Sequence, residues 1–308
     1  MRRGGKMSRE TFRRTLRGKG PVSLKGSAAR KREGDVMHIA KSPVITMAPT
    51  TPIYDGIKIM AKEGFRRIPI ADPGTKTLAG IVTATDIVNY LGGGKKFEIV
   101  QQKFSGNIFK AINEPIKLIM NQKVFAVKTT ADISEAIKLM KEKNVGGLPV
   151  IDEENHVKAI VTERDVARMF ADRISGIKVS QLMTEKVVTA PPKTTIFEAE
   201  KTMIGQGFRR LPIVSDGKVV GIVTAMDIIR FFGSGGVFKH LKSGTITQVL
   251  NTPAMEIATK EVATISPEAD VGQAAKIMRE KNLGALPVVQ NERLVGIITE
   301  RDFFKIIE

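Results

Sequence analysis

Four copies of one short pattern divide this chain of 308 residues, and they constrain its fold more than any other feature. Each copy has a methionine nine positions before a proline, and each continues into an apolar run that ends in Thr-x-x-Asp. The prolines lie in four heptads, at residues 64–70, 144–150, 207–213 and 282–288. Aligned features that recur four times indicate a repeated structural unit. The chain is therefore expected to fold as four copies of one unit.

The copies alternate between two types. The first and third begin Gly-Phe-Arg-Arg, whereas the second and fourth begin Asn-x-Gly and end in Thr-Glu-Arg-Asp. Pro69 and Pro212 are 143 positions apart, and Pro149 and Pro287 are 138 apart, which indicates that a pair of units was duplicated. Units 1 and 2 form one pair, and units 3 and 4 form the other. The predicted divisions are a tail (1–35) and four units with their linkers (36–111, 112–174, 175–245 and 246–308).

Local patterns within a unit predict the order β-α-β-β-α, which places the chain in the α/β class. A short strand at 187–189 precedes Thr195, which together with Glu198 has the spacing of a capping box at a helix start. Two β-runs follow, at 211–214 and 219–223, and a second helix begins near Asp227. Two acidic residues are expected to cap the equivalent first helices of units 2 and 4: Asp132 and Asp270.

The repeated G-x-x-x-x-P-h and G-h-h-T-x-x-D patterns resemble CBS motifs, named after cystathionine β-synthase. The resemblance covers Val36 to Glu308. The four-motif layout is similar to the regulatory γ subunit of AMP-activated protein kinase and to its stand-alone archaeal relatives. This resemblance implies two CBS pairs that form a disc-like, pseudo-symmetric body. It also implies adenine nucleotides bound in clefts between motifs.

The Thr-x-x-Asp ends of the apolar runs are the first candidate binding residues. An Asp at a helix start can accept hydrogen bonds from a ribose diol, and the helix amino terminus favours an anion. The resemblance implies that the aspartates hold ribose: Asp86, Asp165, Asp227 and Asp302. It implies that the threonines bond phosphate: Thr83, Thr162, Thr224 and Thr299. The alternative is that these residues only cap the second helix of each unit.

Arginines supply the second set of candidates, because guanidinium groups match phosphate oxygens. The resemblance places phosphate ligands at the Arg-Arg pairs of units 1 and 3: Arg66, Arg67, Arg209 and Arg210. Units 2 and 4 have small residues there, and their further candidates are Arg164 and Arg301, for which a solvated surface position is the alternative. Ala159 replaces a glycine found in the other three units, so occupancy is least expected in unit 2.

The composition argues against catalysis. The chain has no cysteine, which excludes thiol nucleophiles, disulfides and cysteine-ligated metals. None of its three histidines, His38, His156 and His240, has a catalytic partner at a usual spacing, and Gly92–Lys95 lacks the spacing of a phosphate-binding P-loop. No segment is apolar enough to span a membrane. We expect a cytoplasmic protein that is no enzyme, needs no metal or required cofactor, and takes AMP, ADP or ATP as a regulatory ligand.

Positive charge is concentrated at the amino terminus. Residues 1–35 hold 12 basic and three acidic residues, so they carry +9 of the net +17. Such a segment cannot bury enough surface to fold alone, and clustered cations gain affinity from nucleic-acid backbones. The expected RNA-binding residues are Arg2, Arg3, Lys6, Arg9, Arg13, Arg14, Arg17, Lys19, Lys25, Arg30, Lys31 and Arg32.

Three functions remain open from the sequence. The favoured one is an energy-linked factor whose tail binds ribosomal RNA and which stabilises or silences the ribosome, as a hibernation factor does. The second is a γ-like regulatory protein that controls a kinase or another enzyme. The third is a DNA-binding CBS regulator. A protein partner or a homodimer also stays open, and no membrane partner is expected.

Overall fold

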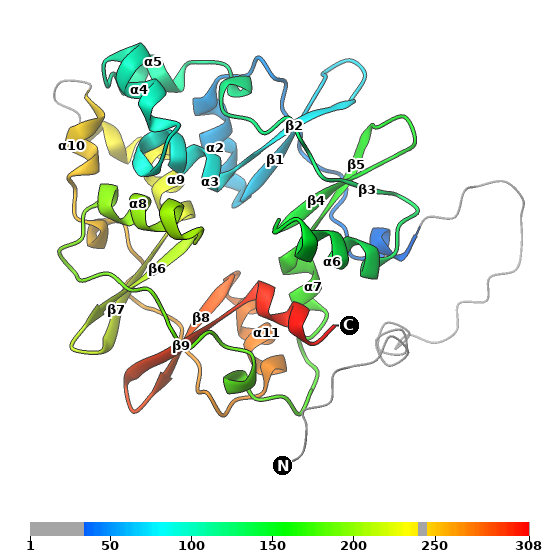
Figure 1. The fold of residues 1–308 in the computed structure, drawn as a ribbon, viewed down its shortest axis with the longest axis vertical. Coiled ribbons are helices and arrows are strands. Elements are labelled where there is room, and N and C mark those ends of the chain that lie inside the picture. The colour runs from blue at the N-terminus through cyan, green and yellow to red at the C-terminus, as the bar shows by residue number, and fades with distance from the viewer. Residues whose placement is uncertain (1–33, 240–244, 308) are drawn as a thin grey trace, which may run out of the picture.

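The computed structural model describes residues 34–239 and 245–307 of the chain (Figure 1). Residues 1–33, which hold all the predicted RNA-binding side chains, lie outside the described residues, as does His240. The last two residues of the predicted tail belong to the folded body. Gly34 N donates to Thr129 O at 2.8 Å, and Asp35 follows in a short 3₁₀ helix, η1 (Asp35–His38).

Each repeat contributes a helix, a β-hairpin and a second helix, as the sequence predicts. Repeat 1 contains α2 (Ile53–Glu63), β1 (Arg67–Ala71), β2 (Leu78–Thr83) and α3 (Ala84–Val88), followed by the π-helix η2 (Asn89–Gly93), α4 (Phe97–Phe104) and α5 (Ile108–Ile112). Repeat 2 contains η3 (Ile116–Leu118), β3 (Val127–Lys128), α6 (Ile133–Glu142), β4 (Gly147–Ile151), β5 (Val157–Thr162) and α7 (Glu163–Arg168).

Repeats 3 and 4 follow the same order. Repeat 3 contains η4 (Val179–Gln181), α8 (Ile196–Gln206), β6 (Arg210–Ser215), β7 (Lys218–Thr224), α9 (Ala225–Gly233), η5 (Gly236–Lys239) and α10 (Ile246–Leu250). Repeat 4 contains η6 (Ala254–Glu256), α11 (Val271–Glu280), β8 (Ala285–Gln290), β9 (Arg293–Thr299) and η7 (Glu300–Lys305). The second helix of repeat 4 is thus a 3₁₀ helix.

The hairpins share one register. The proline of each first strand faces an isoleucine of the second: Pro69 with Ile81, Pro149 with Ile160, Pro212 with Ile222, and Pro287 with Ile297. The predicted first strand of each repeat is shorter than expected. It is the two-residue β3 in repeat 2, whereas in repeat 3 it is one parallel bridge, Ala190 to Ile213.

Helix caps explain why the elements begin where they do. The predicted capping box at Thr195 and Glu198 is confirmed, with Glu198 N donating to Thr195 Oγ1 at 3.2 Å. The cap predicted at Asp132 is wrong, because that side chain makes no cap hydrogen bond. Ile133 N donates instead to Asp35 Oδ1 at 2.6 Å. The last residue of the predicted tail, Asp35, therefore anchors the first helix of repeat 2.

A segment that leads into each repeat pairs with the hairpin of its partner repeat. These lead-in segments are residues 39–45, 119–125, 182–188 and 257–263. They form single antiparallel bridges to the second strands: Lys41 to Ile160, Asn121 to Ile81, Thr184 to Ile297 and Thr259 to Ile222. The bridges join repeat 1 to repeat 2 and repeat 3 to repeat 4, as the spacing of the prolines predicts.

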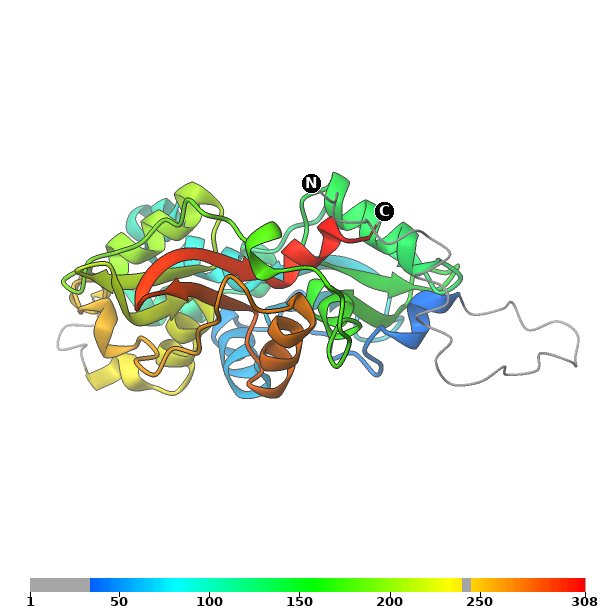
Figure 2. The same cartoon turned by 90° about the horizontal axis from the view of Figure 1, so that it is seen from below.

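The apolar cores lie between the two pairs. One core combines helices of repeats 1 and 3, and the other combines helices of repeats 2 and 4. In Figure 1 the helices α2, α3, α8 and α9 gather on one side of the body, and α6, α7, η7 and α11 gather on the other. The edge-on view in Figure 2 shows the flat, disc-like shape that results. The two pairs are thus held together by buried apolar surface.

Glycines after the second helices of repeats 1 and 3 allow this packing. A Cβ on Gly92 would lie 2.2 Å from Glu200 Oε2 of α8, and one on Gly233 would lie 2.7 Å from Ala61 Cβ of α2. Gly92 has an extended φ of 177°. The glycine run that superficially resembles a phosphate loop therefore serves close helix contact between the pairs.

Candidate functional site

Two ion clusters with the same arrangement lie at the centre of the disc. In the first, Glu300 accepts hydrogen bonds from Arg66 Nη1 and, at 2.8 Å, from Arg164 Nε. The Glu300 side chain is only 2% exposed. Burial opposes its ionisation, but Arg66, Arg164 and Arg210 overcome this effect and lower its pKa to about 2. Glu300 is therefore a buried carboxylate that holds two arginines from other repeats.

The second cluster repeats the first with the repeats exchanged. Glu163 Oε2 accepts from Arg209 Nη2 at 2.7 Å, and Arg301 Nε lies 3.3 Å from Glu163 Oε1. Repeats 2 and 4 also exchange bonds. Arg164 Nη1 donates to Asn282 Oδ1 at 2.6 Å, and Arg301 donates to Asn144. All four repeats contribute to this centre.

Two further arginines lie in the centre without acceptors. Among the described residues, neither the Arg67 nor the Arg210 guanidinium has a hydrogen bond or an ion pair, although both lie beside the clusters. Burial and the positive charge of Arg209 lower the pKa of Arg67 to about 10 and that of Arg210 to about 9. The centre therefore holds six guanidiniums and two carboxylates, an excess of four positive charges. Buried charge without a counter-charge is costly, so this centre is suited to an anion.

The small residues of repeats 2 and 4 make room for these arginines. A Cβ on Gly147 would lie 2.4 Å from Arg67 Nη1, and one on Gly284 would lie 2.3 Å from Arg66 Nη2. The Gly-Phe-Arg-Arg and Asn-x-Gly motifs are therefore complementary halves of one structure. The arginines of one type of repeat occupy the space that the other type leaves open.

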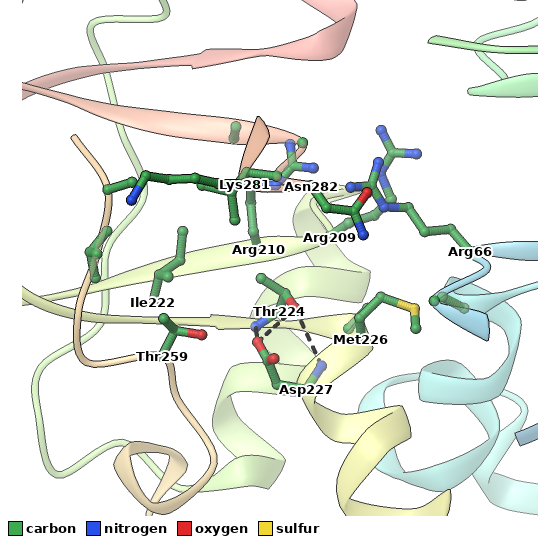
Figure 3. A pocket seen from close by; sticks show the side chains of 18 of the residues that line it. Arg66, Arg209, Arg210, Ile222, Thr224, Met226, Asp227, Thr259, Lys281 and Asn282 are labelled. Atoms are coloured by element: carbon green, nitrogen blue, oxygen red, sulfur yellow. Dashed lines mark hydrogen bonds between the residues drawn. The ribbon is translucent and has the colours of Figure 1, made fainter. Parts of the chain in front are cut away.

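Three cavities open onto the centre. The first, of 440 Å³, is lined by Thr224, Asp227 and Arg210 (Figure 3). The second, of 200 Å³, is lined by Thr162 and Asp165. The third, of 760 Å³, contains Thr83 but not Asp86. Arg66 lines all three cavities, so they share a positively charged side chain.

All four Thr-x-x-Asp motifs have the same local geometry. The Asp Oδ2 accepts from the backbone N–H and the hydroxyl of its Thr, at distances from 2.6 to 2.9 Å. Burial raises the pKa of Asp165 and of Asp227, whose carboxylates line cavities. In every repeat the Thr and Asp thus cap the start of the second helix, which is the alternative role that the sequence offers. This role uses Oδ2 of the aspartate, and the threonine does not contact Oδ1.

The structure brings all six predicted arginines to the centre, where Arg164 pairs with Glu300 and Arg301 pairs with Glu163. The expectation that the site of repeat 2 is the least occupied stays a prediction, but the surroundings of Ala159 differ from those of the glycines that it replaces. Gly80 and Gly296 face Met120 and Met183, and the position equivalent to those methionines opposite Ala159 is Ala40. A smaller side chain there accommodates the extra Cβ.

Sequence reasoning missed the two glutamates. Glu163 and Glu300 occur in the Thr-Glu-Arg-Asp signature of repeats 2 and 4, and this repetition is the signal that could have found them. It also missed Lys96 and Lys305, whose ammonium groups contact Asp86 and Asp302. The repeat pattern does not point to Lys96, because this lysine lies ten residues after Asp86 and outside the repeated motif.

Other polar groups lie away from the centre. His38 is exposed, and His156 Nδ1 lies 2.9 Å from Asp152 Oδ2 in the turn of the β4–β5 hairpin. Glu154 is close enough to complete a three-residue cluster there, but Lys158 also contacts Asp152, at 3.0 Å. Among the described residues, no helix is both long and apolar enough to cross a membrane.

Comparison with known protein families decides the identity of the repeats. Four stretches match the CBS domain: residues 34–93, 116–172, 179–234 and 254–308. The chain belongs to the CBS-domain family. The family resemblance that the motifs predict is therefore confirmed, and so is the mixed α/β fold with four CBS motifs.

Several similar proteins match most of the length of this chain. Protein MJ1225 of Methanocaldococcus jannaschii is 39% identical over 273 residues, which are 88% of this CBS protein and 98% of the relative. Its crystal structure, described as that of a candidate archaeal homologue of γ-AMPK, matches with a TM-score of 0.83, covering 88% of this chain and 98% of that one. A 33.4 kDa protein from the ribosomal RNA operon of Thermofilum pendens is 33% identical over 86% of this chain and 88% of its own length.

Proposed function

We propose that this CBS protein is a non-catalytic sensor of adenine nucleotides, which binds AMP, ADP or ATP with the phosphates at the arginine centre. The observation that carries the proposal is the pair of partly buried guanidiniums, those of Arg67 and Arg210, that lack acceptors among the described residues. Phosphate oxygens supply both the negative charge and the hydrogen-bond acceptors that these groups need.

The 440 Å³ cavity offers each part of a nucleotide a suitable partner. Apolar side chains such as Ile222, Val262 and Pro287 are part of its lining and suit a planar base. Asp227 suits the ribose diol, and Arg210 suits the phosphates (Figure 3). The volume lies within the range usual for small-molecule sites. The relationship to MJ1225, described as a candidate homologue of γ-AMPK, supports the same class of ligand.

Titration of the full chain with adenosine, AMP, ADP and ATP tests this proposal. Affinity is expected to rise with the number of phosphates. Arg67→Met and Arg210→Met are each expected to weaken ATP binding by about 10- to 100-fold, the effect of losing a charge-assisted hydrogen bond. Isothermal titration calorimetry measures both effects.

Arg279→Met is the matched control, since Arg279 pairs with Asp172 away from the three large cavities. It should leave ATP affinity unchanged. Because the side chains of Arg67 and Arg210 pair with no carboxylate, their variants should be at least as thermally stable as the unliganded wild type. Binding of adenosine as tightly as ATP, or unchanged ATP affinity in both variants, would contradict the proposal.

We propose further that the basic residues 1–33 bind RNA, with the ribosome as the favoured target. The charge of this segment and the occurrence of a relative in a ribosomal RNA operon support this assignment. In this role the nucleotide would adjust an energy-linked stabilising or silencing activity on the ribosome. Coupling requires the nucleotide to bind the docked and free states with different affinity.

Gradient sedimentation of lysate tests the second proposal. The full chain is expected to travel with ribosomal particles, and a chain beginning at Gly34 is expected to remain at the top. Raising the salt concentration should release the full chain, because counterions compete for the backbone phosphates. Sedimentation of both chains with ribosomes would show that the tail is not the anchor.

Two alternative functions predict other outcomes of the same experiment. A γ-like regulator of a kinase or another enzyme stays at the top of the gradient and co-purifies with a catalytic protein. A DNA-binding CBS regulator stays at the top and prefers duplex DNA to structured RNA in a binding assay. Either result would replace the ribosome assignment and leave the nucleotide proposal in place.

A further inference from the structure

The four Thr-x-x-Asp aspartates differ in what contacts their second oxygen. Each Oδ2 is held by its own threonine, so Oδ1 is the atom that can receive a ligand. This atom is held by a lysine of the same chain in repeats 1 and 4. In repeats 2 and 3 it is not.

In repeat 1, Lys96 closes the aspartate. Lys96 Nζ donates to Asp86 Oδ1 at 2.9 Å and to the carbonyl of Ile119 at 2.6 Å. Asn121 Nδ2 donates to both Asp86 oxygens at 3.0 Å. The backbone of Lys96 is itself held by Asn89 Oδ1 at 2.8 Å. Asp86 Oδ1 therefore already accepts from two side chains, those of Lys96 and Asn121.

In repeat 4, Lys305 makes the same two bonds. Its Nζ donates to Asp302 Oδ1 at 2.7 Å and to the carbonyl of Leu182 at 2.6 Å. Ile119 and Leu182 hold equivalent positions, two residues before the bridges of the lead-in segments to Ile81 and Ile297. The two lysines come from different positions in their repeats, ten and three residues after the aspartate. They nevertheless link the same pair of groups.

Repeats 2 and 3 lack this arrangement. Among the described residues, no group donates to Asp165 Oδ1. Asp227 Oδ1 accepts only from Arg230, whose side chain is 54% exposed and lines the 440 Å³ cavity. Asp165 and Asp227 line cavities, whereas Asp86 and Asp302 line none of the three large ones. A ligand can reach these two carboxylates without breaking a bond to a backbone carbonyl.

We infer that only the aspartates of repeats 2 and 3 bind the ribose of a nucleotide, and that Lys96 and Lys305 close the other two sites. The inference rests on the nucleotide-binding function proposed above. A ribose hydroxyl that displaced Lys96 would replace an ion pair with a hydrogen bond from a neutral donor, and it would leave the ammonium group without its carboxylate. Such an exchange weakens binding by about 10- to 100-fold. The lysines thus determine how many of the four sites are used.

The number of nucleotides bound by the full chain tests the inference. Equilibrium dialysis with radiolabelled ATP is expected to give two per chain for the wild type. The double variant Lys96→Met/Lys305→Met is expected to bind more than two. Lys95→Met/Lys138→Met is the matched control, since both lysines are exposed and neither contacts a Thr-x-x-Asp motif. It should still bind two.

A second pair of variants tests the same inference even if the lysine variants do not fold. Asp165→Asn and Asp227→Asn retain a capping side chain, and each is expected to remove one bound ATP. Three or four ATP per wild-type chain, or two retained by Asp165→Asn/Asp227→Asn, would overturn the inference while the proposed function stands. Absence of AMP, ADP and ATP binding in the wild type would overturn the proposed function itself.

Discussion

Replacing Glu300 by Gln is expected to lower the free energy of unfolding by about 3–5 kcal/mol, the cost of removing one partner from a buried ion pair. Glu300 is 2% exposed and holds Arg66 and Arg164, which come from two other repeats. A neutral amide leaves both partly buried guanidiniums beside Arg210 without this counter-charge. Chemical denaturation of the wild type and the variant at neutral pH measures the loss.

The Glu300 carboxylate also makes the free energy of unfolding depend on pH in the acid range. The pKa of Glu300 is about 2 in the folded protein, against an ordinary value of 4.5. The unfolded chain therefore binds a proton more readily than the folded chain in this range. The stability that Glu300 provides is present above pH 4.5 and is lost as the pH falls through 2. Glu300→Gln should remove this part of the acid dependence.

Glu292→Gln is the control for Glu300→Gln. Glu292 also pairs with a basic residue, Lys218, but its side chain is 76% exposed, and such pairs contribute little. Pyrophosphate or ATP should raise the melting temperature of Glu300→Gln more than that of the wild type, because the variant has more unpaired guanidiniums. Equal stability of Glu300→Gln and Glu292→Gln would show that the central ion clusters do not hold the repeats together.

Replacing Glu200 by Met is expected to have the opposite effect and to raise the free energy of unfolding by about 1–3 kcal/mol at neutral pH. Glu200 lies on α8 against the π-helix of repeat 1 and is fully buried. Neither of its carboxyl oxygens has a hydrogen-bond partner among the described residues. Methionine has a similar length and buries no polar group.

Burial raises the pKa of Glu200 well above its ordinary value of 4.5. The folded chain therefore keeps this proton at a pH where the unfolded chain has released it. The wild type should lose stability as the pH rises from 4.5 towards the raised pKa, and Glu200→Met should not show this loss. Unfolding curves from pH 4 to 9 measure the difference.

Glu200→Gln separates ionisation from burial. Glutamine cannot ionise, so this variant should lose the pH dependence, but it keeps a buried polar group and should gain less stability than Glu200→Met. Glu98→Met, on an exposed position of α4, controls for the added apolar side chain. A Glu200→Met protein less stable than the wild type would mean that the carboxyl group has a stabilising partner.

The sequence by itself determined the repeated unit, the pairing of the repeats and the Thr-x-x-Asp motifs. These features depend on contacts between residues close in the chain or on a pattern repeated along it. The Thr224–Asp227 box, for example, is completed within three residues. The Arg-Arg pairs were also identified as candidates, because the two types of repeat differ at those positions.

The tertiary structure alone decided which charges meet and which aspartates are open. Glu300 binds Arg164 and Arg66 across 136 and 234 residues of sequence, and Lys96 reaches Asp86 only because the π-helix turns the chain back. Likewise, the cores form between the pairs, where α2 meets α9 and α8 meets η2. Such contacts depend on how the four similar units pack together. The local sequence pattern of a unit is the same whichever unit it packs against, so it does not predict these contacts.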